Sequence, residues 1–347
     1  MKGLRLYIPP FAPDDSGAAA VLYKLGGFTV ILDAGGCAGN IAGFDEPRTN
    51  EKSSVFSAGL RDMDAILGRD EKLVEKLASA VKQVNAKFVA IIGTPVPAVI
   101  GTDYRALKRM IESRLNVPAV TLDTDGTRFY DEGISKAYVE LFETFATNTK
   151  KKKVLGILGA THFDFPEKFD WRKFAASQPY DEILLYGYDG SLDSFIKAGD
   201  VEKNLVVSIA GLKAAKYLRE RFGTPFEVFR PLMKCELSPS NAEIAKEKGK
   251  NLVMHEQFCA NAVRDKIESL SHRETVTVGC WFTMDKEYAR IGDVKFTEEK
   301  DFQDYVKAED FDVIFADRIF MRAIPFYKKT FIPLHHFAVS GSEARNA

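Results

Sequence analysis

The chain has 347 residues, which is longer than a single hydrophobic core usually supports, so we expect two or three lobes of roughly 100–150 residues each. A hydrophobic fraction of 46% and a charged fraction of 28% are typical of a folded protein and exclude a disordered or low-complexity chain. The 48 Lys and Arg residues nearly balance the 49 Asp and Glu residues, for a net charge of −1. Bulk electrostatic attraction to nucleic acid or anionic lipid is therefore absent, and we predict neither as a partner.

The first residues contain prolines and acids where a secretory signal would need a continuous apolar stretch. The longest apolar runs, such as 88–92 and 154–158, are far shorter than the roughly 20 residues that cross a bilayer. We therefore predict a cytoplasmic protein. Its cysteines, Cys37, Cys235, Cys259 and Cys280, are too few and too widely spaced for a disulfide framework, which predicts reduced thiols that are buried or bound to metal.

In the first third of the chain, short β-rich apolar runs alternate with segments of helical period. This alternation indicates βαβ units and a parallel sheet, hence an α/β fold. We expect strands over 28–32, 88–92 and 119–122, and helices over 73–84, 106–115 and 134–145. The basic run 150–153 is typical of a solvated linker before a second lobe.

The same alternation continues through the rest of the chain and predicts two further parallel sheets. For the second lobe we expect strands over 154–158, 182–186, 205–208 and 226–229, with a helix over 214–222. For the third we expect a helix over 241–248 and strands over 251–254, 275–280 and 313–316. The predicted domains are 1–150, 151–247 and 248–347, three Rossmann-like lobes whose ligands would bind in clefts at the carboxyl ends of the strands.

The common nucleotide and hydrolase motifs are absent from the sequence. No GxxxxGK[ST] loop occurs, and the glycines near position 35 lack the spacing of a dinucleotide loop. A GxSxG elbow and an HExxH zinc helix are absent as well. The sequence therefore does not support autonomous binding of ATP or NAD.

A glycine-rich segment, Asp33-Ala34-Gly35-Gly36-Cys37-Ala38-Gly39-Asn40, directly follows the first predicted strand. Small residues such as Gly35 and Gly36 let a backbone approach closely around the Cys37 thiol, which suits a bound cluster or ligand. The alternative is a tight glycine turn around a buried structural cysteine. Arg48, a few residues later, is a candidate for binding an anionic group, or for a surface ion pair.

A second segment, from Gly93 to Asp103, follows another predicted strand and opens a helix. The Thr94 hydroxyl and the amides at the helix start are suited to an anionic group. A proline-rich turn capped by Thr102 or Asp103 explains the same residues equally well.

Several segments, in order along nearly the whole chain, resemble the nitrogenase component 1 family: Gly35-Gly36-Cys37, 94–103, 126–137, Glu256-Gln257, and the ending 333–341. That family includes nitrogenase molybdenum–iron protein subunits, cofactor-assembly scaffolds, the light-independent protochlorophyllide reductase and the reductive cyclase of nickel-tetrapyrrole synthesis. The resemblance implies three Rossmann-like lobes and a homodimer or a heterodimer with a related subunit. It also implies electrons from an ATP-dependent iron–sulfur reductase protein.

The resemblance further implies an iron–sulfur cluster near the subunit interface, held by cysteines of three loops, with Cys37 in the middle one. The other two loops depart from the family pattern, because Thr94-Pro95 replaces a Thr-Cys pair, and Asp14 and Asp15 lie where the first loop would carry a cysteine. A four-iron cluster uses four ligands. Either these aspartates, a second subunit type or an outside ligand complete the set, or the cluster has been lost.

His162 and His255 each follow a predicted strand, and both are expected to face one central cleft. Histidine donates protons near neutral pH, so we predict these two as catalytic proton donors or ligands. The alternative for each is a hydrogen-bonded surface histidine. His335 and His336 are expected to secure the C-terminal segment. Arg128 and Arg264 are either anion-binding residues or members of ion pairs.

These observations predict a nitrogenase-like oxidoreductase component that takes low-potential electrons from the reductase and reduces a substrate or cofactor in the interlobe cleft. The alternative on the same fold is a non-redox protein that binds or scaffolds a metallocofactor or tetrapyrrole. A purely architectural subunit supporting a cysteine-complete partner is a third reading.

Overall fold

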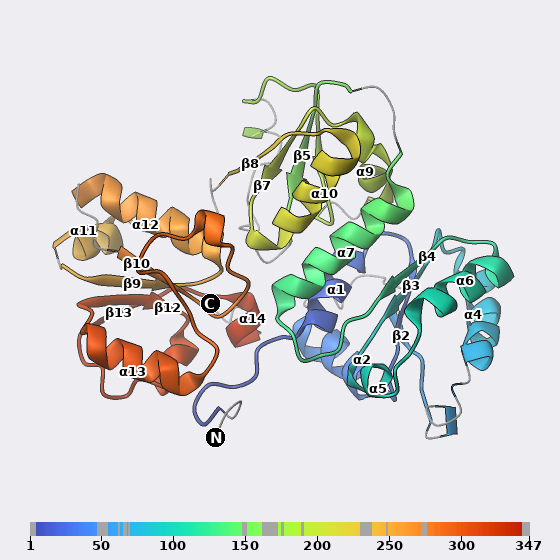
Figure 1. Cartoon of the computed structure of the whole chain (residues 1–347), viewed down its shortest axis with the longest axis horizontal. Coiled ribbons are helices and arrows are strands. Elements are labelled where there is room, and N and C mark those ends of the chain that lie inside the picture. The colour runs from blue at the N-terminus through green and yellow to red at the C-terminus, as the bar shows by residue number, and fades with distance from the viewer. Residues whose placement is uncertain are drawn as a thin grey trace.

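The computed structural model describes residues 5–46, 55–61, 63–64, 68, 70–147, 151–161, 173–174, 177–188, 191–229, 238–247, 249–271 and 276–341. Three parallel sheets follow one another along these residues, and each occupies its own lobe, as Figure 1 shows. None of the helices described is long and apolar enough to cross a membrane. The prediction of an α/β fold with three parallel sheets is confirmed.

The first sheet has the strand order β2-β1-β3-β4, and every neighbouring pair is parallel. Its strands β1, β3 and β4 coincide with predicted runs, and their side chains are almost entirely buried because helices cover both faces. The elements are α1 (Asp14–Leu22), β1 (Phe28–Ile31), α2 (Gly36–Asn40), a π-helical turn (Ile41–Asp45), β2 (Val55–Ser57), α4 (Asp70–Val84), β3 (Val89–Ile92), α5 (Pro95–Val99), α6 (Tyr104–Leu115), β4 (Ala119–Leu122) and α7 (Tyr130–Phe145).

The second sheet has the order β6-β5-β7-β8 and is also parallel throughout. Its elements are β5 (Val154–Leu158), β6 (Glu182–Leu185), α9 (Leu192–Ile196), a 3₁₀ turn (Lys197–Asp200), β7 (Lys203–Val206), a 3₁₀ turn (Ile209–Gly211), α10 (Leu212–Phe222) and β8 (Phe226–Val228). The helix α10 ends at Gly223, whose φ of 67° is the left-handed conformation common after helices.

The third sheet has the order β11-β10-β9-β12-β13, with all pairs parallel. Its elements are α11 (Pro239–Glu247), β9 (Asn251–Met254), α12 (Gln257–Ser271), β10 (Val276–Cys280), a 3₁₀ turn (Lys286–Tyr288), β11 (Val294–Lys295), α13 (Glu299–Glu309), β12 (Val313–Ala316), a 3₁₀ turn (Arg318–Arg322), β13 (Thr330–Pro333) and α14 (Phe337–Ser340). The edge strands β11 and β13 were not among the predicted strands.

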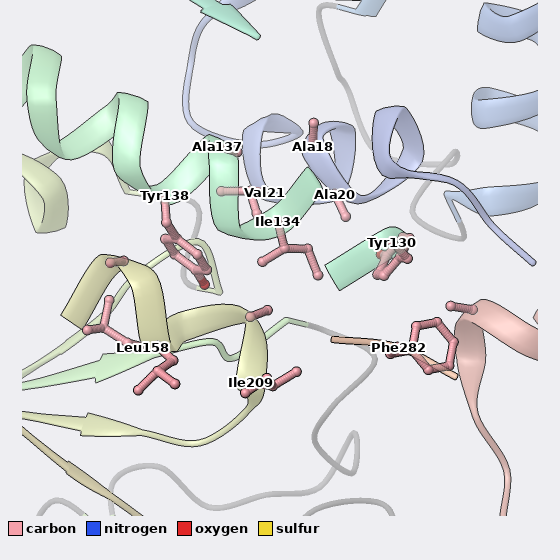
Figure 2. Close-up of a cluster of buried hydrophobic side chains, with 14 of the residues drawn as sticks. Ala18, Ala20, Val21, Tyr130, Ile134, Ala137, Tyr138, Leu158, Ile209 and Phe282 are labelled. Atoms are coloured by element: carbon pink, nitrogen blue, oxygen red, sulfur yellow. The ribbon is translucent and has the colours of Figure 1, made fainter. Parts of the chain in front are cut away.

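The helices α1 and α7 pack against each other, and α7 also contacts α9 and α10 of the second lobe, as Figure 1 shows. Figure 2 shows apolar side chains of α1 and α7, including Val21 and Ile134, on the side that faces Leu158 and Ile209 of the second lobe. The same buried cluster includes Phe282 of the third lobe. One continuous apolar core therefore joins the three lobes, while the exact domain boundaries stay a prediction.

Candidate functional site

The loop after β1 presents Cys37 at the carboxyl edge of the first sheet. Gly35 adopts a φ of 121°, which favours glycine, and turns the chain into the short helix α2. Asp33 holds this loop, because its carboxylate accepts hydrogen bonds from the Ala38 N–H (2.8 Å) and the Ser57 hydroxyl (2.6 Å). Cys37 is consequently half-buried in a fixed loop, next to the exposed residues Gly35 and Gly36.

The Thr94 side chain connects the ends of β3 and β1. Its hydroxyl donates to the Leu32 carbonyl at 2.8 Å, and the residue is completely buried. The Thr94 side chain also lies close to the Cys37 thiol and partly offsets the rise that burial causes in the pKa of that thiol. The structure thus brings Thr94 and Cys37 together, with Thr94 positioning the loop edge; a contact between Thr94 and a cofactor stays a prediction.

Asp14 and Asp15 both lie in the buried first turn of α1, but they have different surroundings. The Asp14 carboxylate accepts hydrogen bonds from the N–H groups of Gly126 (2.8 Å) and Asp125 (3.2 Å). It therefore attaches α1 to the turn before α7, and both of its oxygens are occupied. Asp15 accepts a hydrogen bond from the Ser16 N–H at 2.8 Å, and its charge acts on the Cys37 thiol. Of the two predicted ligands, Asp15 is the one that has Cys37 as an electrostatic neighbour.

The electrostatics of this edge are acidic. Burial, together with the neighbouring charges of Asp14 and Asp45, raises the pKa of Asp15 to about 7. Burial also raises the pKa of the Cys37 thiol, and the carboxylates of Asp15 and Asp33 add to that rise. A bound cation would reverse both effects, because it stabilises the carboxylate and the thiolate.

Sequence reasoning assigned no role to Asp33 and Asp45, two residues that help to build this site. Asp45 accepts hydrogen bonds from the Ser16 hydroxyl (2.6 Å) and the Asn40 side-chain amide (3.2 Å), which attaches α1 to the Cys37 loop. Asp33 carried a usable signal, since it directly follows a strand at the edge where polar groups gather. Asp45 carried none, because its role depends on α1 lying beside a segment 29 residues away.

Arg48 and His162 lie outside the described residues, as does Cys235. Within the described part of the chain, no group of three or more His, Cys, Asp or Glu side chains is arranged to hold a metal ion. Cys259 is disulfide-bonded, so the prediction of reduced thiols is wrong for this residue, whereas Cys37 and Cys280 are free.

His255 lies at the carboxyl edge of the third sheet, packed among residues of the C-terminal segment. Its Nε2 atom is 3.0 Å from the His335 carbonyl oxygen, and its ring centroid is 4.3 Å from that of His336. The His336 ring stacks in turn on Phe282 at 4.2 Å. Burial lowers the pKa of His255 to about 4, so the imidazole is neutral near pH 7. A catalytic role for His255 stays a prediction, and these contacts show that the residue also has a structural one.

Asp317 organises the same edge and was not predicted. Its buried carboxylate accepts hydrogen bonds from the Ser340 hydroxyl (2.6 Å) and from the N–H groups of His336 (2.9 Å) and Ile319 (3.0 Å). The His335 ring lies 2.9 Å from the Ser340 hydroxyl. These bonds secure the C-terminal segment, which is the role expected for His335 and His336.

The two arginines with alternative roles form ion pairs. Arg264 is buried and pairs with Asp293 at 2.6 Å. Arg128 is exposed on the turn before α7, and its Nε donates to Asp125 at 3.1 Å. Where the three lobes meet, a cavity of about 60 Å³ is lined by residues including Asp131, Lys213 and Thr283. That volume holds a few water molecules at most.

Known proteins are similar to this chain in sequence and in fold. Residues 16–236 match the family described as nitrogenase component 1 type oxidoreductase. The chain belongs to that family. A curated relative, the nitrogenase iron-molybdenum cofactor biosynthesis protein NifE of Clostridium pasteurianum, is 23% identical over 175 residues, which are 49% of this chain and 38% of the relative. The chain therefore matches well under half the length of that relative.

Two solved structures titled as nitrogenase Cp1 share the fold of this chain. The structure titled "Nitrogenase Cp1 at pH 6.5" aligns with a TM-score of 0.71 at 12% identity, covering 96% of this chain and 87% of the other. "Nitrogenase Cp1 at pH 5" aligns with a TM-score of 0.67 at 13% identity, covering 97% and 87%. The family and the fold expected from the Gly-Gly-Cys segment and the other segments are thereby confirmed.

Proposed function

We propose that this chain is a subunit of a nitrogenase-like oxidoreductase that holds an iron–sulfur cluster at the edge formed by Cys37 and Asp15. In this proposal the subunit accepts low-potential electrons from an ATP-dependent iron–sulfur reductase and passes them to a substrate or cofactor in the interlobe cleft. One observation carries it: the half-buried Cys37 thiol lies at an open, glycine-rich edge within the field of the buried Asp15 carboxylate.

The donor set of one chain fits half of a shared cluster site. One thiol and one carboxylate supply two ligands, and a second copy across a two-fold axis would supply the other two of the four that a four-iron cluster uses. Burial and the neighbouring carboxylates raise the pKa values of Cys37 and Asp15, and a bound cation would offset that rise because it stabilises the thiolate and the carboxylate. A carboxylate is a harder ligand than a thiolate, so such a cluster would be held less tightly than an all-cysteine one.

The surface around Cys37 supports a shared site. A Cβ added at Gly35, Gly36 or Gly39 would meet no atom of the described residues within 4 Å, and all three glycines are exposed, so this edge is open to another molecule. The adjacent helix α5 exposes Val96, Val99 and Ile100, with Val99 86% exposed. Exposed apolar side chains that gather beside a ligand edge are typical of a subunit interface.

The residues of this chain would position the ligands. Asp33 holds the Cys37 loop by accepting a hydrogen bond from the Ala38 N–H, and Thr94 holds the start of that loop through the Leu32 carbonyl. Asp14 holds the turn beside Asp15 by accepting a hydrogen bond from the Gly126 N–H. When bound, an iron–sulfur cluster would supply one-electron transfer at low potential. The protein's part is to hold the thiolate and the carboxylate in place and to control their protonation.

The test is anaerobic purification of the full chain, reconstitution with iron and sulfide, and measurement of iron, acid-labile sulfide and the visible spectrum. We expect bound cluster in the wild type, its loss in Cys37→Ser, and retention in the control Cys280→Ser, whose thiol is buried in the third lobe. Asp15→Asn should weaken cluster retention, and Asp15→Cys should restore or tighten it because thiolate is the softer ligand. An iron-free wild type, or iron content unchanged in Cys37→Ser, contradicts the proposal.

The second candidate is a non-redox scaffold for a metallocofactor. The observation that favours it is that, among the described residues, Cys37 is the one thiol at this edge, together with a relative named as a cofactor biosynthesis protein. The two functions differ in electron flow: a reduced iron–sulfur reductase with ATP should oxidise in the presence of the electron-transfer subunit and remain reduced in the presence of a scaffold.

A further inference from the structure

A cavity of about 380 Å³ lies between the N-terminal segment and the turn before α7. The same turn also lies beside Asp15. Its volume is within the range of roughly 300–1,000 Å³ that small-molecule sites occupy. The residues of its lining that could recognise a ligand are Arg5, Phe11, Thr127, Arg128 and Phe129. None of these residues belongs to the Cys37 edge.

Arg5 is the unusual feature of this cavity. Its guanidinium lies over the Phe11 ring, 4.1 Å from the centroid, and 5.2 Å from that of Trp281. Among the residues described, its side chain makes one hydrogen bond, from Nη1 to the Pro9 carbonyl at 3.2 Å, and has no carboxylate partner. A guanidinium carries five N–H donors, so most of them are available to a ligand.

The carboxylate that acts most strongly on the charge of Arg5, that of Glu299, has other hydrogen-bond partners. Glu299 is buried, and it accepts hydrogen bonds from the backbone N–H groups of Leu6, Tyr7 and Ile8 at 3.0–3.1 Å. These bonds attach the N-terminal segment to the third lobe and hold Arg5 in position. Burial lowers the pKa of Arg5, while the more distant charges of Glu299 and Glu298 raise it, so the guanidinium stays charged without a direct ion pair.

The opposite wall supplies a second cation and apolar rings. Arg128 uses its Nε atom for Asp125, which leaves the terminal nitrogens of its fork without a partner in the described chain. The rings of Phe11 and Phe129 each lie 5.6 Å from Phe282, which holds both in place. Two guanidinium groups with fixed aromatic rings suit an anion that has a flat apolar part.

We propose that this cavity binds a small organic anion, a carboxylate or a phosphate monoester with a planar apolar group, through the N–H donors of Arg5 and Arg128. The ligand's planar group would pack on the Phe129 side of the lining, because the Phe11 ring is buried between Arg5 and Phe282. The site is formed by one chain and needs no cluster, so it goes beyond the function proposed above. Its failure and the failure of the cluster proposal are therefore separate outcomes.

The test is isothermal titration calorimetry of the full chain with benzoate and with phenyl phosphate, which distinguish the carboxylate from the phosphate monoester. Acetate, inorganic phosphate and the neutral benzyl alcohol are the comparison probes. We expect one of the two aromatic anions to bind, with acetate and inorganic phosphate weaker because they lack the ring, and benzyl alcohol weaker because it lacks the charge.

Arg5→Gln and Arg128→Gln should each weaken that binding by about tenfold or more, since each loses charge-assisted hydrogen bonds. The control Arg105→Gln, on the exposed surface of α6, and Cys37→Ala should bind like the wild type. If thermal unfolding shows that Arg5→Gln does not fold, the binding measured with Arg128→Gln tests the proposal. Absence of binding by both aromatic anions, unchanged binding in both arginine variants, or equal binding of benzyl alcohol would overturn the proposal.

Discussion

The carboxyl edges of the first and third sheets both contain buried ionisable side chains, but the groups around those side chains differ. At the first, acidic groups surround a thiol. At the third, the His255 ring lies tilted against the His336 ring, and the His336 ring stacks on Phe282. Burial lowers the pKa of both histidines, because the charged imidazolium is poorly solvated there. The neighbouring carboxylate of Asp317 acts in the opposite direction on His255 and only partly offsets the burial.

The lowered pKa of His255 predicts that the folded protein loses stability in acid. His255 has a folded-state pKa of about 4, below the value of about 6.5 in an unfolded chain, so its contribution is fully present above pH 6.5 and is lost as the pH falls toward 4. The loss for this residue is at most about 3 kcal/mol. Urea unfolding between pH 7.5 and about pH 4 should show a shallower decline in His255→Gln than in the wild type. An equally steep decline in the variant would show that other groups cause the acid sensitivity.

At the scale of elements, the contact between α1 and α7 positions the first-turn carboxylates. The two helices approach so closely that a Cβ added at Gly133 would lie 1.7 Å from the Asp14 carbonyl oxygen, and one at Gly17 would lie 2.0 Å from the Tyr130 carbonyl oxygen. This approach places Asp14 within hydrogen-bond distance of the 125–126 turn and Asp15 near Cys37. The positions of these two carboxylates therefore depend on how α1 and α7 pack where the lobes meet.

Gly133→Ala should therefore destabilise the fold by about 1–3 kcal/mol or more, because the backbones must separate to admit the methyl group. The matched control is Gly39→Ala in α2, where an added Cβ meets no atom of the part of the chain that the structure describes within 4 Å. That change should leave stability unchanged or raise it by up to about 1 kcal/mol, as alanine is the better helix former. Chemical denaturation measures both, and a Gly133→Ala variant as stable as the wild type would contradict this account of the helix crossing.

At the scale of the whole molecule, the proposed cluster needs a second subunit, and the exposed face of α5 is where we expect contact. Val99→Glu places a charge on that face and should weaken dimerisation by about tenfold or more, because a charge would be desolvated in an apolar interface. The control is Ile291→Glu, since Ile291 is fully exposed in the third lobe. Analytical ultracentrifugation of the full chain measures the effect. A monomeric wild type, or a dimer unaffected by Val99→Glu, would contradict a homodimer through this face.

The elements that local patterns specify were predicted well. Strands β4, β5, β9 and β12 match their predicted ranges residue for residue, because each is a short apolar run buried on both faces. Strands β2, β11 and β13 were missed because they are short edge strands whose mixed burial leaves no continuous apolar run. Helix α1 was missed because it is buried along its whole length and so lacks the polar face of an amphipathic helix.

By itself the sequence determined the fold class, three parallel sheets and the exposed glycine loop around Cys37, since each depends on residues that are close together in the chain. Only the tertiary structure decided which distant groups meet: Asp15 with Cys37, His255 with a segment 80 residues away, and Arg5 with aromatic rings of another lobe. The physical reason is that burial, charge and hydrogen bonding depend on distances in space. Those distances are set by how α1, α7 and the third sheet pack together.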